Sequence, residues 1–170
     1  GLMILTLRPF RVGDYIDAGG VAGTVVELGL FITELTTPDN RYISVPNSAV
    51  FGGIIINYSR HSRRRLDVPV GVAYGADLAM ARRVLLDLAH ADSRVHQDPP
   101  PQVLVIALAD SSVNLTLRVW TSGAEIWMLN FDLNEAVKNA LDAAGIEIPF
   151  PQRVVELRGG GVVSPDPSTL

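Results

Sequence analysis

The stretch Arg8-Pro9-Phe10-Arg11-Val12-Gly13-Asp14-Tyr15-Ile16 marks the point where this 170-residue chain changes character. Residues 1–7 before it are apolar apart from one threonine, and we expect residues 1–11 to be the end of a longer hydrophobic helix that starts upstream. Residues 12–59 after it contain many β-branched and aromatic residues separated by turn residues, a pattern typical of short strands. The stretch therefore predicts a helix that leads directly into a β module.

Five short strands are predicted in the β module, over residues 15–18, 21–28, 30–37, 41–45 and 53–59. They are separated by Gly19-Gly20, Pro38-Asp39-Asn40 and Pro46-Asn47-Ser48, which are residue types that favour turns. Short strands joined by tight turns indicate a small barrel-like or sandwich domain, which we assign to residues 12–62.

A basic segment, Arg60-His61-Ser62-Arg63-Arg64-Arg65, follows the predicted strands. Residues 1–66 carry a net charge of +2 and residues 67–170 carry −6, within a total of −4. The asymmetry and the change of pattern together predict a domain boundary at this segment.

Residues 63–150 alternate between strand and helix patterns. Asp77 can cap a first helix, and Gly145 suits the end of a second one. The apolar faces of these helices carry Leu78, Ala81, Leu85 and Leu88 in the first, and Ile126, Leu129, Leu133, Val137 and Leu141 in the second. Strands are predicted over residues 66–72, 103–109, 113–120 and 146–148. The order βαββαβ is the ferredoxin-like arrangement, so the fold class is α+β.

The strand over residues 103–109 is wholly apolar, and we expect it at the centre of its sheet. Another strand is predicted over residues 152–157, after both domains are complete, within a segment that we assign to residues 151–158. A strand without a partner in its own domain has unpaired amides and should pair elsewhere. Residues 159–170 contain Gly159-Gly160-Gly161 and two prolines, and we expect a flexible tail.

Composition favours an oligomer. Hydrophobic residues make up 48% of the chain, charged residues 19%, and mean hydropathy is +0.26. No apolar run approaches the roughly 18 residues that a membrane span needs. The excess apolar surface is therefore expected at subunit interfaces.

No catalytic motif is present, and the sequence predicts neither an enzyme nor a cofactor. It contains no phosphate-binding glycine loop with a lysine, no nucleophile elbow and no zinc-binding helix motif. Cysteine is absent, and the three histidines stand apart from one another, so no metal site is expected.

The opening stretch resembles the junction between the pore-lining helix and the β domain in the small-conductance mechanosensitive ion channel (MscS) family. Further resemblances follow in the order of the family and cover about residues 1–157. They are Gly19-Gly20-Val21-Ala22-Gly23-Thr24-Val25, Val45-Pro46-Asn47-Ser48, Ile55-Ile56-Asn57-Tyr58-Ser59-Arg60, Val70-Gly71-Val72-Ala73-Tyr74, Val113 to Trp120, Ala143-Ala144-Gly145-Ile146 and Pro149-Phe150-Pro151-Gln152.

The resemblance implies the cytoplasmic vestibule of a homoheptameric channel that releases ions and small osmolytes on hypoosmotic shock. It implies an Sm-like β domain above a ferredoxin-like α/β domain, with portals between subunits. It also implies a parallel β-barrel at the base that takes one strand from each subunit, with Val154, Val155 and Leu157 as barrel residues. The full-length protein would lie in the cell inner (plasma) membrane, with this region on the cytoplasmic side.

The resemblance also suggests roles for charged residues. Arg8 and Arg11 fall where family arginines face the membrane and could meet lipid headgroups, although simple surface charge would also explain them. The residues near the portals, and hence beside permeating ions, are Arg60, His61, Arg63, Arg64, Arg65 and Asp67.

Two other interpretations of the arginine cluster stay open. It could be a charged segment between domains, or it could bind phosphates in an Sm-like nucleic-acid-binding protein that uses Arg60 to Arg65. The net negative charge, and the lack of aromatics among the arginines, argue against nucleic acid as a partner.

Overall fold

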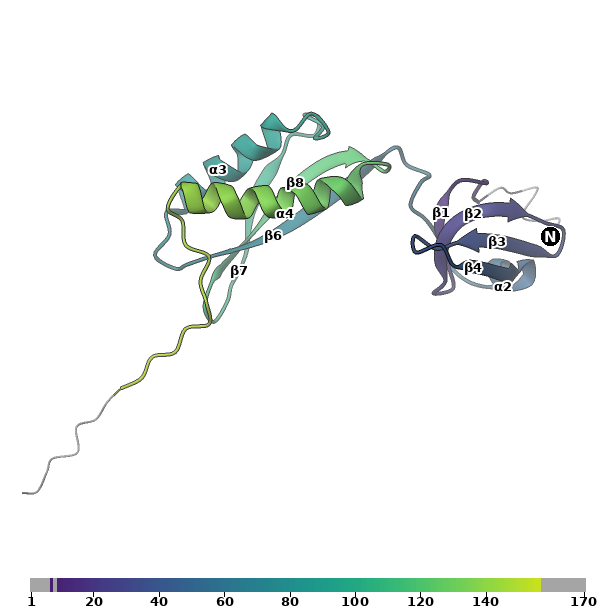
Figure 1. The fold of residues 1–170 in the computed structure, drawn as a ribbon, viewed down its shortest axis with the longest axis horizontal. Coiled ribbons are helices and arrows are strands. Elements are labelled where there is room, and N and C mark those ends of the chain that lie inside the picture. Colours follow the sequence, from purple (N-terminus) through teal and green to yellow (C-terminus); the bar gives the residue numbers. More distant parts are fainter. Residues whose placement is uncertain (1–6, 8, 157–170) are drawn as a thin grey trace, which may run out of the picture.

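The structure is a computed structural model that describes residue 7 and residues 9–156. It contains a five-stranded sheet and a three-stranded sheet, joined by the segment that follows strand β5 (Figure 1). Each sheet builds its own hydrophobic core. The predicted helix over residues 1–11 falls largely outside the described residues.

The first sheet is antiparallel throughout, with the strand order β4-β3-β2-β1-β5. Its strands are β1 (Tyr15–Ala18), β2 (Ala22–Leu28), β3 (Ile32–Thr36), β4 (Tyr42–Pro46) and β5 (Ile55–Asn57). All five lie within or close to the predicted ranges. Phe10, which precedes the sheet in the sequence, is buried in its core beside Ile16, Val25, Leu35 and Val50.

A short helix, α2 (Asn47–Gly52), was not predicted, because Pro46-Asn47-Ser48 suggested only the end of a strand. A buried polar network holds this helix against the sheet. The Asn47 amide donates to the Gly29 carbonyl at 2.9 Å and accepts from the Thr33 hydroxyl at 2.7 Å. These bonds satisfy a side chain that is 3% exposed, since a buried amide without partners would be costly.

The second sheet has the order β6-β8-β7 and is also antiparallel. Its strands are β6 (Arg63–Val72), β7 (Gln102–Leu108) and β8 (Val113–Ser122), and the helices α3 (Leu78–Ala91) and α4 (Ile126–Ala143) cover one face (Figure 1). Strand β6 begins three residues before the predicted strand, at Arg63.

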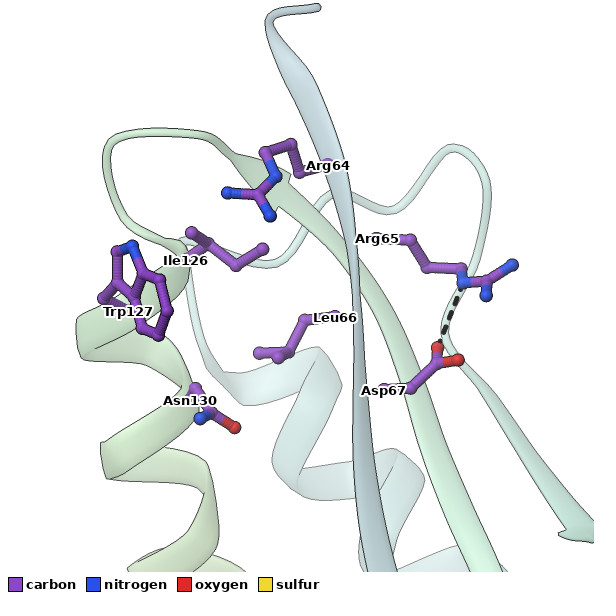
Figure 2. A pocket seen from close by; sticks show the side chains of 7 residues that line it. All are labelled: Arg64, Arg65, Leu66, Asp67, Ile126, Trp127 and Asn130. Atoms are coloured by element: carbon purple, nitrogen blue, oxygen red, sulfur yellow. Dashed lines mark ion pairs between the residues drawn. The ribbon is translucent and has the colours of Figure 1, made fainter. Parts of the chain in front are cut away.

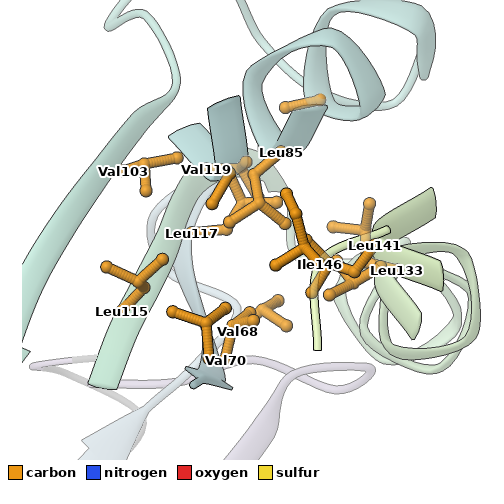
Figure 3. Packing of buried hydrophobic residues seen from close by; sticks show 14 of the residues in the cluster. Val68, Val70, Leu85, Val103, Leu115, Leu117, Val119, Leu133, Leu141 and Ile146 are labelled. Atoms are coloured by element: carbon orange, nitrogen blue, oxygen red, sulfur yellow. The ribbon is translucent and has the colours of Figure 1, made fainter. Parts of the chain in front are cut away.

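Both helices have the predicted apolar faces. Asp77 caps α3, since its Oδ1 accepts from the backbone amides of Ala79 and Met80. All five residues of the stripe predicted for α4 are buried. Gly145 has φ +68°, the left-handed conformation expected after a helix. Figure 3 shows Leu85 of α3 beside Leu117 of β8, and Leu141 of α4 beside Ile146, in the same core.

The prediction that residues 103–109 form the central strand is wrong. Strand β7 lies at an edge, and β8 is central because it pairs with both β6 and β7. Of the apolar side chains in β7, Val103 is buried, but Val105, Ile106 and Leu108 are exposed. Within residues 9–156, an apolar strand therefore lies at the surface, and none of these residues covers its free edge.

The strand predicted over residues 146–148 is also absent. One backbone hydrogen bond, from the Ala73 amide to the Glu147 carbonyl, links this segment to the end of β6, and Ile146 is buried. Pro149 and Pro151 follow, and neither has an amide hydrogen to extend a ladder. The second unit is thus βαββα, with an irregular segment where the sixth element was expected.

Residues 151–156 run away from the second sheet and form no strand with the rest of the described chain (Figure 1). A strand is defined by its partner, and the described part of the chain offers no partner strand for these residues. Among the described residues, no helix is long and apolar enough to cross a membrane.

Truncating Leu117 should destabilise the chain far more than truncating Leu108. Leu117 is 0% exposed and Leu108 is 73% exposed, so Leu117→Ala leaves a cavity and Leu108→Ala does not. We expect Leu117→Ala to lower the free energy of unfolding by about 2–5 kcal/mol, and Leu108→Ala to lower it by well under 1 kcal/mol. Urea unfolding measures both. Equal losses would contradict the assigned burial.

Candidate functional site

The basic segment lies where the chain leaves the first sheet and begins β6. Side chains of a strand point alternately to its two faces, and β6 obeys this rule. Arg64 and Leu66 point to the face that the helices cover, whereas Arg65 and Asp67 point to the opposite face (Figure 2). The six residues predicted to lie together near a portal therefore do not form one cluster. They lie on the two faces of β6 and in the segment before it.

Asp67 is the centre of an ion-pair group on the open face of the sheet. Arg118, its register partner on β8, donates Nε to Asp67 Oδ1 at 2.9 Å and Nη2 to Oδ2 at 3.1 Å. Arg65 adds an ion pair from Nε to Oδ1 at 3.2 Å. The hydrogen bonds from Arg118, followed by the charges of Arg118 and Arg65, hold the pKa of Asp67 below its usual value.

Arg64 lies over the ring of Tyr58, with its guanidinium carbon 5.0 Å from the ring centroid, a cation–π contact. A groove of about 190 Å³ lies beside it, between the start of β6 and the start of α4. Its lining includes Leu66, Ile126 and the exposed Trp127 (Figure 2). Arg64 thus connects residues 58–62, which lead from the first sheet to β6, to the second unit.

The remaining members of the cluster are exposed. Arg63 donates Nη1 to the Asp98 carbonyl at 2.9 Å, and Arg60 and His61 lie in the segment before β6. Three other predicted site residues lie among the described residues. Arg11, predicted to face the membrane, is exposed, and the predicted barrel residues Val154 and Val155 are 95% and 75% exposed. Arg8 and Leu157 lie outside the described residues.

Sequence reasoning missed Arg118 and Tyr58 as members of this site. Arg118 stands on the polar face of a correctly predicted strand, which is a partial signal, but its pairing with Asp67 depends on a register that the sequence does not give. Within the described residues, no group of histidine and carboxylate side chains could hold a metal ion.

Two family models match the chain in succession. The mechanosensitive ion channel β-domain matches residues 1–60, and the C-terminal domain of the mechanosensitive ion channel MscS matches residues 66–148. The chain belongs to the MscS family of mechanosensitive channels. This family consists of channels, which agrees with the expectation of a protein that is not an enzyme, and the match does not support the nucleic-acid alternative.

Named relatives agree with this assignment. A small-conductance mechanosensitive channel of Edwardsiella ictaluri is 47% identical over 157 residues, which are 92% of this chain and 55% of that protein. The mechanosensitive channel MscK of Escherichia coli is 37% identical over 121 residues, which are 71% of this chain and 11% of that protein. The chain spans about half the length of the first curated relatives it matches.

Among solved structures, the closed state of Helicobacter pylori MscS superposes with a TM-score of 0.87 at 32% identity. The match covers 94% of this chain and 63% of the Helicobacter chain. The MSL1 protein of Arabidopsis thaliana shares the fold, with a TM-score of 0.71 at 23% identity over 88% of this chain and 56% of that one. The α+β fold is therefore that of an MscS cytoplasmic region.

Replacing Asp67 by asparagine should reduce stability more at neutral pH than at acid pH. A carboxyl group with a lowered folded-state pKa stabilises the fold above its unfolded pKa of about 3.9, and this contribution is lost as the pH falls through the lower folded value. We expect Asp67→Asn to cost about 1 kcal/mol or less at pH 7, because the pair is partly exposed. Near pH 3 the difference from wild type should shrink.

Urea unfolding at the two pH values provides the measurement, since urea does not screen charge. Asp110→Asn, in the exposed turn between β7 and β8, is the control and should change little at either pH. A cost for Asp67→Asn that stays constant with pH would refute the ion-pair account.

Proposed function

We propose that this chain is the cytoplasmic vestibule of a channel that opens under membrane tension and releases ions and small osmolytes on hypoosmotic shock. The observation that carries the proposal is the joint match of both units, in order, to the two MscS family models. The remainder of the parent protein would supply the membrane helices, since the chain spans about half of its relatives. The protein would lie in the inner (plasma) membrane with this region on the cytoplasmic side.

The proposal extends to assembly as a homoheptamer. Exposed apolar side chains on the single chain support it, including Phe31, Leu108 and Phe150, which are at least 73% exposed. We further propose that residues 12–62 form an Sm-like domain and residues 63–150 a ferredoxin-like one, for which the two separate cores are the support. The segment after residue 150 would contribute one strand to a shared barrel.

The portal assignment of the basic segment is part of the same proposal. Asp67 is bonded to Arg118 and Arg65, so its charge is offset locally and the segment as a whole stays positive. A positive wall beside an ion path raises the local concentration of anions. Arg11, and Arg8 with it, would meet lipid headgroups at the membrane side.

Charge reversal in the basic segment should change ion preference without removing the current. In patches of membrane that contain the full-length protein, we expect suction to open a pore whose reversal potential is measured in a salt gradient. Arg60→Glu together with Arg63→Glu should shift this potential toward cation preference, whereas Arg83→Glu on the exposed side of α3 should leave it unchanged. A pore that never opens under tension would refute the proposed function, and an unchanged potential would refute the portal assignment.

A single cysteine at residue 154 should cross-link copies of the chain. The sequence has no cysteine, so Val154→Cys introduces a unique thiol. Neighbouring strands in a barrel lie about 4.8 Å apart, which is within the Cα separation of a disulfide. We expect mild oxidation to give covalent dimers on a denaturing gel.

The control is Ser93→Cys, in an exposed loop of the second unit, which should stay monomeric on the same gel. Equal cross-linking of the two variants, or none at residue 154, would count against the shared barrel.

A further inference from the structure

Asn57, the last residue of β5, uses every hydrogen-bonding position of its side chain. Its Nδ2 donates to the Pro9 carbonyl at 3.1 Å and to Asp14 Oδ2 at 2.8 Å. Its Oδ1 accepts from the backbone amides of Ser59 and Arg60, both at 2.9 Å. A carboxamide donates two hydrogen bonds and accepts two, so the hydrogen-bonding capacity of Asn57 is fully used. One half-buried side chain therefore holds two separate segments of the chain.

The first of these segments is the incoming one, residues 9–14, which precedes the first sheet. It is fixed by more than Asn57. Phe10 is 1% exposed within the core, and the Arg11 amide donates to Asp14 Oδ2 at 3.0 Å. Gly13 donates to the Val25 carbonyl at 2.8 Å, and Val25 donates back to the Asp14 carbonyl at 2.9 Å. The incoming segment is therefore part of the sheet's rigid body.

The second is the outgoing segment, residues 58–62, which leads to β6. Ser59 Oγ accepts from the Tyr15 amide at 2.9 Å, and the Tyr58 amide donates to the Tyr15 carbonyl at 3.0 Å. Tyr58 in turn lies under Arg64, at the start of the second sheet. The contacts thus form an unbroken series from Pro9 through Asn57 to the second unit.

We propose that Asn57 is a positioning residue for gating, which makes the incoming segment and the outgoing segment move as one body. The inference rests on the proposed function, because the incoming segment would connect to the pore-lining helix. When tension moves that helix, the bonds of Asn57 carry the displacement to the second unit. The second unit must then move together with the pore-lining helix, which raises the membrane tension needed to open the pore.

Asparagine is the residue type required at this joint, by which we mean the hydrogen-bonded connection between the incoming and outgoing segments. Aspartate keeps the oxygens that accept from Ser59 and Arg60 but has no donor for Pro9, and it places a second carboxylate against Asp14. Glutamine has the same groups on a longer side chain, which displaces all of them. Asn57→Asp is therefore expected to loosen the incoming segment, which keeps its contacts through Phe10 and Gly13, while the outgoing bonds remain.

A paired exchange separates this role from simple stability. In the double variant Asn57→Asp with Asp14→Asn, the amide at residue 14 can donate to the carboxylate at residue 57, so one bond returns with reversed polarity. Asn139→Asp, on the exposed side of α4, introduces the same charge elsewhere and serves as the control.

The first measurement detects the joint directly and does not depend on channel activity. Spin labels are placed at exposed Val12, in the incoming segment, and at exposed Asp87, on α3, with labelled chains diluted into unlabelled chains. We expect a narrow distance distribution in the otherwise unchanged chain and in Asn139→Asp, a measurably broader one in Asn57→Asp, and a narrow one again in the double variant. An unchanged width in Asn57→Asp would overturn the proposal.

The second measurement is the tension at half-maximal opening of the full-length protein in membrane patches. We expect Asn57→Asp to lower it, the double variant to bring it back toward the original value, and Asn139→Asp to leave it unchanged. A broadened distance distribution with an unaltered opening tension would overturn the role in gating. A third outcome separates the two proposals. If the distances respond as expected but neither the original protein nor any variant opens under tension, Asn57 still joins the two segments, and the proposed channel function is refuted.

Discussion

The backbone amides and carbonyls at the edge of a strand either pair with another strand or stay exposed as a template for one. In the described part of the chain, strand β7 has a free edge with exposed apolar side chains, and residues 151–156 pair with no strand. A chain with this surface would be prone to aggregate unless other copies covered it. The need for neighbours is the constraint from which the proposed ring, portals and shared barrel all follow.

Within one chain, the two cores are complete and separate, and a short segment joins them. The clustered positive charge lies in this segment and at the start of β6, where alternation along the strand sends Arg64 toward the helices and Arg65 toward the open face. Asp67 is held by Arg118 from the neighbouring strand, and Arg64 rests on Tyr58. Charge at this place is thus ordered by strand geometry, and Asn57 fixes the segment where it leaves the first sheet.

Much of this fold could be predicted because the residues that form a periodic apolar pattern in the sequence are the ones buried in the structure. The alternation in residues 113–120 and the stripe from Ile126 to Leu141 identified β8 and α4, and Asp77 marked the start of α3. The position of β7 could not be predicted, since an apolar strand looks the same whether it is buried by its own chain or left for a neighbour. The pairing of Asp67 with Arg118, and the bonds of Asn57 to Pro9 and Asp14, depend on which strands pair and in what register, which residue types alone do not specify.

The mass of the 170-residue chain in solution, followed over a range of concentrations by sedimentation, tests most directly whether copies complete one another. One copy has a mass of 18.3 kDa. The account predicts a discrete species of about seven times that mass, which persists on dilution because the copies complete one another's surfaces. A species of one copy at every concentration would contradict the account. The exposed edge of β7 and residues 151–156 would then be stable in water without partners.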